Sequence, residues 1–349
     1  MKKLLSLLLV LILSLGVLAA CGADDNSDGS SSSSVPGSSS SSDGEDNSDT
    51  TQKTEINLTV LNGSTGFGMA QLMENNANGK TENVYNVNIA TVVGDVEKAL
   101  IAGTVDIAAL PTNSAAKVYN KTNGQVQILA INTLGVLYMI DKTGTVNSIN
   151  DLSGKTVYVP SDNPNFITKH IINSNGVKNV TIDSTTFPNP QALQAAVKAG
   201  QVDIAVLPQP VVTAAMAGAK QAGFEYKIAL DMTAEWDRAN DEQLVQGCIV
   251  VRKDFASKNK GAIENFLKEY EESINYLNNN PKDAAGLIVK HGIFANATVA
   301  EKAIPKSNVV FIIGNEMKSA MSAYVLAMFN IDKESVGEKI PQDDFYYIK

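Results

Sequence analysis

The sequence has few of the residues that build disulfide, zinc or nucleic-acid sites. It contains two cysteines, two histidines and one tryptophan in 349 residues, and 6% of its residues are aromatic. This excludes a disulfide-rich scaffold and the usual four-ligand structural zinc site. Acidic residues outnumber basic ones, 37 to 28, for a formal net charge of −9. A nucleic-acid-binding surface needs excess positive charge. We therefore expect no nucleic-acid partner, no metal and no cofactor.

The rest of the composition is that of a folded, soluble α/β protein. The chain is 44% hydrophobic and 19% charged, which excludes a wholly disordered protein. Its length suggests two or three domain-sized units. Strand-like apolar runs alternate with amphipathic segments of helical length, the pattern of a sheet with crossover helices.

The N-terminus has the features of a secretory signal. Lys2 and Lys3 precede an apolar run over 4–15, and the segment ends in Leu-Ala-Ala before Cys21. It resembles a bacterial lipoprotein signal, in which Cys21 is lipidated after cleavage. The alternative is a transmembrane helix, which needs about 20 apolar residues, but the small residues before Cys21 favour cleavage. We predict a signal peptide over 1–20.

A polar tether is expected to follow Cys21. Residues 22–53 hold twelve serines and seven acids but one lysine. Such a segment has almost no apolar surface to bury, so we predict disorder over 21–53. It would hold the folded part away from a lipid surface. No second apolar run of membrane-spanning length follows.

Several strands and helices can be placed by pattern. We expect strands over 56–61, 105–110, 156–159 and 204–207, further strand material over 127–140, and helices from about 69 and over 95–102. The C-terminal third is predicted to be helical. There, Ile263, Phe266, Tyr270 and Ile274 share one face, and a methionine stripe at 317, 321 and 328 indicates core packing.

Cys248 is the second cysteine and has no partner in the predicted folded part. It stands between Gly247 and the apolar run 249–251. A nucleophilic cysteine needs a histidine close in space, and the sequence gives no sign of one. We interpret Cys248 as a buried strand residue.

An internal repeat indicates two related halves. Residues 99–111 read ALIAGTVDIAALP and residues 196–208 read AVKAGQVDIAVLP, with nine of thirteen positions identical. Each copy predicts a helix that ends at a glycine (Gly103, Gly200) and a short strand that stops at a proline. Asp106 and Asp203 stand at the start of these strands, the wrong end for a ligand, and are interpreted as structural.

Four loops follow strands and are the candidate ligand site. Ligands of open α/β sheets bind beyond the carboxyl ends of the strands, at helix N-termini. The loops are 62–68 and 112–114 in the first half, and 161–165 and 209–210 in the second. Their serines, threonines and asparagines could instead be helix caps. Taken together, however, the four loops favour a ligand.

Some ligand classes lack their usual signatures. The glycines at 63, 66 and 68 fit neither a P-loop nor a dinucleotide fingerprint. The two arginines, Arg238 and Arg252, lie outside the four loops, although arginine usually grips amino acids and phosphates. The ligand is then neutral or weakly anionic, or backbone amides hold its charge. Four aromatic residues could line the cleft or the core: Phe67, Tyr138, Phe166 and Trp236.

These segments resemble the solute-binding lipoproteins of ABC importers in the nitrate, sulfonate, taurine and thiamine-precursor group. The resemblance covers about 55–349. It rests on NGSTGFGMAQLM, GTVDIAALPTNSAA, DLSGKTVYVP, FLKEYEESINYLNNNP and PQDDFYYIK. It implies an α/β type II periplasmic-binding-protein fold, with two lobes, a cleft between them and two hinge crossings. Lobe one would comprise 54–138 plus 247–349, and lobe two 139–246.

The resemblance also implies a function and a site. The protein would be an extracytoplasmic, membrane-anchored monomer that captures a small polar or heterocyclic solute by hinge closure and delivers it to a membrane permease. The binding residues would be Ser64, Thr65, Gly66, Phe67, Thr112, Asn113, Ser161, Asp162, Asn163 and Gln209.

Two rival functions follow from the same sequence. One is an exported enzyme on this fold related to thiamine-pyrimidine synthesis, and the other an adhesin. An enzyme needs a reactive side chain near the loops. His291 lies far from them in sequence, and His170 stands in a helix-like segment. An adhesin would not need matching loops in both halves. We therefore expect a binding protein and no catalysis.

Overall fold

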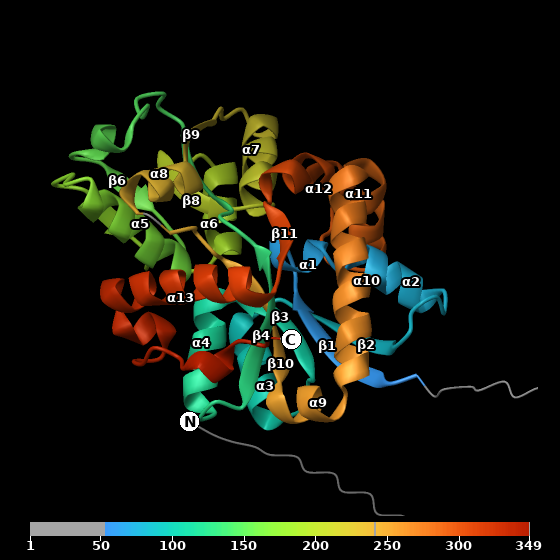
Figure 1. The fold of residues 1–349 in the computed structure, drawn as a ribbon. Helices are drawn as coiled ribbons and strands as arrows, with labels where there is room; N and C mark the ends of the chain where they lie inside the picture. The colour runs from blue at the N-terminus through green and yellow to red at the C-terminus, as the bar shows by residue number, and fades with distance from the viewer. Residues whose placement is uncertain (1–52, 241, 349) are drawn as a thin grey trace, which may run out of the picture. The chain divides into compact units, whose positions relative to one another are not determined.

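The computed structural model describes residues 53–240 and 242–348 and contains two sheets (Figure 1). The signal peptide, Cys21 and most of the predicted tether lie outside the described residues. Within them, no helix is long and apolar enough to cross a membrane. The predicted mixed α/β class is confirmed.

The first sheet has six strands in the order β11-β4-β10-β3-β1-β2. β1 pairs in parallel with β2 and β3, and β10 runs antiparallel between β3 and β4. The strands are β1 (Glu55–Leu61), β2 (Val84–Ala90), β3 (Ile107–Pro111), β4 (Val126–Thr133), β10 (Gly247–Arg252) and β11 (Val309–Ile312).

The second sheet has five strands in the order β7-β6-β8-β5-β9. β5 runs antiparallel to β8 and β9, and β6 is parallel to β7 and β8. The strands are β5 (Leu137–Asp141), β6 (Thr156–Tyr158), β7 (Thr181–Asp183), β8 (Ile204–Pro208) and β9 (Lys227–Asp231). The chain enters this sheet after Thr133 and is back in the first sheet at Gly247.

Helices pack on both sheets (Figure 1). Those before β10 are α1 (Ser64–Phe67), α2 (Ala70–Ala77), α3 (Val93–Ala102), α4 (Thr112–Lys121), α5 (Asn163–Ser174), α6 (Pro190–Lys198), α7 (Val211–Gln221) and α8 (Met232–Ala239). Those after it are α9 (Lys253–Lys258), α10 (Lys260–Asn279), α11 (Pro281–Lys290), α12 (Ala297–Ala303) and α13 (Gly314–Ile331). Short 3₁₀ turns are η1 (Ile149–Leu152), η2 (Ile304–Lys306), η3 (Lys333–Val336) and η4 (Asp343–Phe345).

The repeat folds as predicted in both sheets. Gly103 caps α3 in the left-handed conformation, at φ 73°, and Gly200 has φ 66° after α6. Each strand that follows ends at its proline, Pro111 or Pro208. A residue without Cβ adopts positive φ at little cost, and proline cannot continue a ladder, so both signals act locally.

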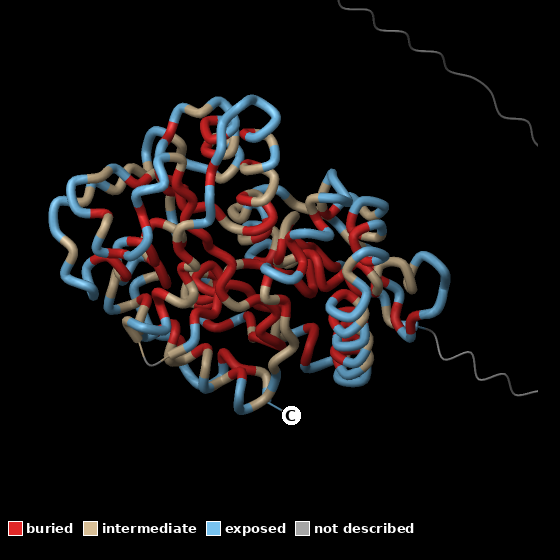
Figure 2. Tube along the Cα trace, turned by 90° about the horizontal axis from the view of Figure 1, so that it is seen from above, coloured by how far each residue is buried: buried red, intermediate tan, exposed pale blue. Residues whose placement is uncertain are grey.

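The buried residues form continuous cores between the sheets and their helices (Figure 2). One face of α10 is buried as predicted, and so is the methionine stripe of α13. One core cluster runs from Leu110 and Ala115 of the first sheet's side, through Met321 of α13, to Ile167 and Trp236 of the second sheet's side. The two sheets are therefore packed together.

Candidate functional site

The carboxyl ends of strands from both sheets meet at one place. β1 and β3 are parallel and lead into Ser64 and Thr112, whereas β6 and β8 are parallel and lead into the α5 N-terminus and Gln209. The Ser64 hydroxyl donates a buried hydrogen bond of 2.9 Å to the Gln209 carbonyl oxygen. The predicted loops of the two halves therefore face each other and touch.

A C-terminal segment, residues 304–308, joins this meeting point. Ser307 Oγ lies 3.0 Å from Ser64 Oγ. The Tyr138 hydroxyl donates to the Lys306 carbonyl at 3.1 Å, and Asn308 Nδ2 donates to the Gly135 carbonyl at 2.5 Å. This segment bonds the first sheet's loop and also the chain that passes between the sheets.

Six buried polar atoms at these strand ends have no hydrogen-bond partner among the described residues. They stand after β3, on the first turns of α5, after β8, and on α8 after β9. They are Thr112 Oγ1, Asn113 Oδ1, Asn165 Oδ1, Thr168 Oγ1, Gln209 Nε2 and Thr233 Oγ1. Leaving such an atom buried and unpaired costs about 1–3 kcal/mol. All six belong to segments that follow the carboxyl ends of strands, and an ordered water or a ligand would complete their hydrogen bonding.

Tyr324 links this region to α13. Its hydroxyl donates to Asn163 Oδ1 at 3.0 Å, and its ring centroid lies 5.9 Å from that of Trp236. Burial raises the pKa of the Tyr324 hydroxyl, so it stays protonated and keeps its donor role. In Figure 1, α13 passes beside α4, and it contacts α4 and α5.

Some predicted site residues have structural roles here. Phe67 is fully buried in the core, with its ring centroid 6.4 Å from that of Phe294. A Cβ on Gly66 would lie 2.3 Å from the Leu61 carbonyl oxygen, so close backbone packing requires the glycine. Thr65 is half-buried, and its carbonyl accepts from Asn132 Nδ2 at 2.9 Å.

The residues of the predicted loop 161–165 have different roles in the structure. The Ser161 hydroxyl donates to the Pro188 carbonyl at 2.8 Å, and Asp162 is exposed as the N-cap of α5. Asn163 and Asn165 are buried on the first turn of that helix. Asn165 belongs to the predicted loop but not to the predicted site residues.

Sequence reasoning missed Thr168, Thr233 and Tyr324. Thr168 stands three residues after Asn165, so helical spacing from that loop could have found it. Thr233 follows the α8 N-cap Asp231 and lies against Gly135, where a Cβ would meet its Oγ1 at 2.0 Å. Tyr324 reads as one more core position of α13, and no local signal marks it.

The reactive side chains are occupied elsewhere. His170 Nε2 lies 2.7 Å from Asn240 Oδ1, and His291 Nε2 lies 2.9 Å from Glu74 Oε2. Cys248 is fully buried on β10, as predicted, and burial raises the pKa of its thiol. Within 53–240 and 242–348, no group of three or more His, Cys, Asp or Glu side chains could hold a metal ion.

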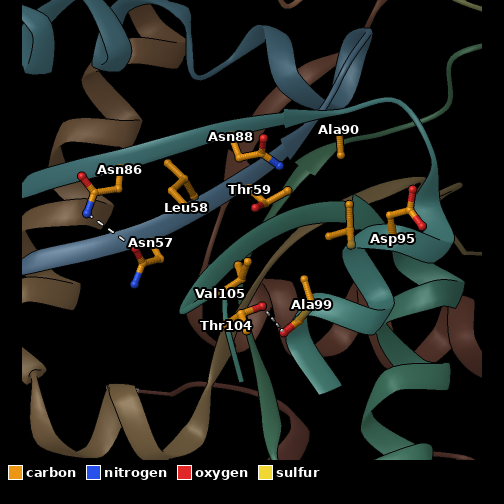
Figure 3. Close-up of a pocket in the computed structure, with 11 residues that line it drawn as sticks. Asn57, Leu58, Thr59, Asn86, Asn88, Ala90, Asp95, Ala99, Thr104 and Val105 are labelled. Carbon is orange, nitrogen blue, oxygen red and sulfur yellow. Dashed lines mark hydrogen bonds between the residues drawn. The ribbon is translucent and has the colours of Figure 1, made fainter. Parts of the chain in front are cut away.

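Two pockets lie at the surface, and the first reaches Ala90, whose carbonyl accepts from the Asn62 N–H of the first loop at 2.9 Å. One, of about 290 Å³, is lined by Asn57, Asn86, Asn88 and Asp95 among others, between β1, β2 and α3 (Figure 3). There Asn86 Nδ2 lies 3.5 Å from Asn57 Oδ1. The other, of about 320 Å³, is lined by residues around β6 and the start of β8. Both pockets include residues that precede β3 or β8, at the ends of these strands opposite the meeting loops.

Comparison with known proteins identifies the family. The NMT1/THI5 like family model matches residues 86–284, more than half of the chain. The protein belongs to the NMT1/THI5-like family. This match includes β3, α4, α5 and the loop after β8. The resemblance stated from the sequence is therefore confirmed for the family. No curated protein matches the chain.

Solved structures show the fold. An ABC transporter protein from Parabacteroides distasonis has 22% sequence identity and a TM-score of 0.72, over 85% of this chain and all of its own. The aliphatic sulphonate binding protein SsuA from Escherichia coli has 13% identity and a TM-score of 0.65, over 83% and 93%. The nitrate-binding protein NrtA from Synechocystis has 13% identity and a TM-score of 0.56, over 84% of each chain. The predicted type II periplasmic-binding-protein fold is confirmed.

Proposed function

We propose that the protein is the extracytoplasmic substrate-binding lipoprotein of an ABC importer. It captures a small polar or heterocyclic solute between two lobes and presents it to a membrane permease. The observation that carries this proposal is the meeting of strand-end loops from both sheets, with unpaired buried polar atoms on each side. A solute that bonds both sides favours the closed form by its differential affinity.

The proposed site draws on both halves. Thr112 and Asn113 stand on one side, and Asn163, Asn165 and Gln209 on the other. The proposed lobes are 54–138 plus 247–349 and 139–246. The two sheets support this division. The strands of the first sheet lie within 55–133 and 247–312, and those of the second within 137–231, so only β5 crosses a proposed limit, by two residues.

The proposal includes anchoring through lipid on Cys21 and action as a monomer. One acyl chain gives marginal membrane binding, whereas several chains anchor stably. A protein that starts at Thr54 should bind the same solute as the full chain, because every residue of the proposed site lies after Thr54 in the sequence. Calorimetry on both forms measures this, and loss of binding on truncation would contradict it.

Closure can be measured with spin labels. Cysteines replace two exposed lysines, Lys220 on α7 and Lys302 on α12, helices that touch each other in this structure. Adding a small-molecule extract of yeast cells should shorten the label-to-label distance. A pair on one side, at Lys260 and Lys282, is the control and should not change. An unchanged distance for the first pair, despite retained solute, would contradict hinge closure.

A further inference from the structure

The helix N-termini at the proposed site offer few free backbone N–H groups for binding an anion. Free backbone N–H groups usually make such ends attractive to anions. Here the Thr112 N–H already donates to the Gln246 carbonyl at 3.3 Å, and the Gln209 N–H donates to the Val136 carbonyl at 2.9 Å. Pro164 in the first turn of α5 and Pro210 before α7 have no N–H. Several of the donors that would hold an anion are therefore used or missing.

The side chains at this edge do not compensate with positive charge. At this edge, the residues with unpaired buried atoms are threonines, asparagines and a glutamine. The charged residues at the helix N-caps here are acids: Asp231 caps α8 with its side chain, and Asp162 occupies the N-cap position of α5. Arg238 pairs with Glu235. Arg252, at the opposite end of β10, bonds Asp106. An anion buried here would stay uncompensated, which is costly.

Neighbouring bonds fix which atom of Asn113 and of Gln209 is left unpaired. Asn113 Nδ2 donates to the Ser335 carbonyl at 3.3 Å, so Asn113 Oδ1 is left as an acceptor. Gln209 Oε1 accepts from Thr213 Oγ1 at 2.7 Å, so Gln209 Nε2 is left as a donor. Threonine hydroxyls can do either. A matching ligand must therefore offer donors and acceptors together.

We propose that the solute is uncharged and carries N–H or O–H donors beside carbonyl, ether or ring-nitrogen acceptors. This rests on the proposed function and deepens it. It separates this chain from the structural neighbours named for sulphonate and nitrate. Amide, lactam and hydroxyl groups satisfy the unpaired side chains without burying a charge.

The first test uses the full chain in detergent at pH 7 and is read by native mass spectrometry and calorimetry. The chain is exposed to the yeast extract, washed, and the retained compound is eluted and identified. An uncharged compound with donors and acceptors supports the proposal, whereas a net anion or cation overturns it. Retention of nothing overturns the transport function itself. Nitrate and ethanesulfonate are titrated separately, and binding tighter than about 0.1 mM by either also overturns the proposal.

The second test compares two amide-to-acid variants with the retained compound. Gln209→Glu removes the unpaired donor and should weaken binding by tenfold or more, about 1.4 kcal/mol. Asn165→Asp keeps an acceptor oxygen and stands in the first turn of α5, where the helix dipole stabilises a carboxylate, so it should weaken binding less than Gln209→Glu does. Both add one negative charge, so an anionic solute would be weakened by both to a similar extent. That result would overturn the proposal, and circular dichroism checks that both variants fold.

Discussion

Both copies of the repeat make the same contact: a cation bonds the carbonyl of the glycine after the helix and pairs with the aspartate before the strand. We call this contact the clip, and its burial differs between the two sheets. In the first sheet, Arg252 donates to the Gly103 carbonyl at 2.8 Å and pairs with Asp106 at 3.3 Å. In the second, Lys142 donates to the Gly200 carbonyl at 2.7 Å and pairs with Asp203 at 2.9 Å. Arg252 ends β10 and Lys142 directly follows β5, and these are the strands that run antiparallel to the two repeat strands. Each clip thus ties a helix end to the start of a strand.

Burial separates the two clips. The Asp106 side chain is 10% exposed and that of Asp203 is 61% exposed. Asp106 also accepts from Asn57, through the backbone N–H at 2.9 Å and Nδ2 at 3.0 Å. β1 pairs with β3 over several residues, whereas β6 pairs with β8 only at Tyr158 and Ala205. The burial of the aspartate in the clip therefore depends on how far the neighbouring strand pairs with the repeat strand, and not on the repeat itself.

Replacing each of the two aspartates by alanine should give the largest difference in stability loss between the two clips. Asp106→Ala leaves Asn57 without its acceptor and leaves the Arg252 guanidinium with only the Gly103 carbonyl and the exposed Asp254, so we expect about 2 kcal/mol less stability. Asp203→Ala breaks an exposed ion pair and should change stability by less than about 0.5 kcal/mol. Urea unfolding of the full chain measures both. Asp106→Asn is the matched control of equal size. Equal losses from the two alanine variants would contradict the role of the neighbouring strand.

Replacing arginine by lysine in the first clip, and lysine by arginine in the second, should give a smaller difference in stability. Arg252 uses two nitrogens on three acceptors, the Gly103 carbonyl, Asp106 and Asp254, which lysine cannot reproduce, so Arg252→Lys should cost about 1–2 kcal/mol. Lys142→Arg adds donors beside Asp203, whose side chain is 61% exposed, and should be neutral within about 0.5 kcal/mol. The same unfolding assay reads both variants. A neutral Arg252→Lys would show that a single charge is enough for the buried clip.

Two carboxylates, Glu74 in the first half and Asp183 in the second, should differ in how strongly salt changes their pKa values. Lys290, with Asn78 and His291, lowers the pKa of Glu74 to about 2. Hydrogen bonds from Thr186 and Thr185 lower the pKa of Asp183 to about 2. Both pKa values lie below their unfolded values, so both groups stabilise the fold above about pH 4 and lose this effect as pH falls toward 2.

Salt screens the charge pair but not the neutral donors. Raising NaCl to about 1 M should raise the pKa of Glu74 clearly and leave that of Asp183 nearly unchanged. Carboxyl chemical shifts in an NMR titration follow each group. Lys290→Gln should raise the pKa of Glu74, and Thr186→Val that of Asp183. Equal salt responses would mean that the two carboxylates have the same kind of partner.

The sequence predicted most of the fold because its signals are local. The positions of β1, β3, β6 and β8 follow from apolar runs bounded by glycine and proline, and the buried face of α10 follows from helical spacing. The structural roles of Asp106 and Asp203 are confirmed, although their cationic partners lie far away in sequence. The turn at 62–68 was expected as a loop, but Ser64–Phe67 forms a helical turn.

The site was less predictable because its members meet only in space. Thr112, Asn113, Asn163 and Gln209 were proposed from their places after strands. Nothing near Ser64 in sequence indicates its bond to the Gln209 carbonyl, 145 residues away. Tyr324 looks like any other buried residue of α13 until its hydroxyl is seen on Asn163.

By itself, the sequence determined the elements, the repeat and the membership of a family, because these depend on short-range pattern and on local backbone preference. Only the tertiary structure decided which copy of the clip is buried, which polar atoms are left unpaired and which helix reaches the second half. Burial and hydrogen-bond pairing depend on what packs against a residue, and those neighbours are brought together by folding from distant parts of the chain.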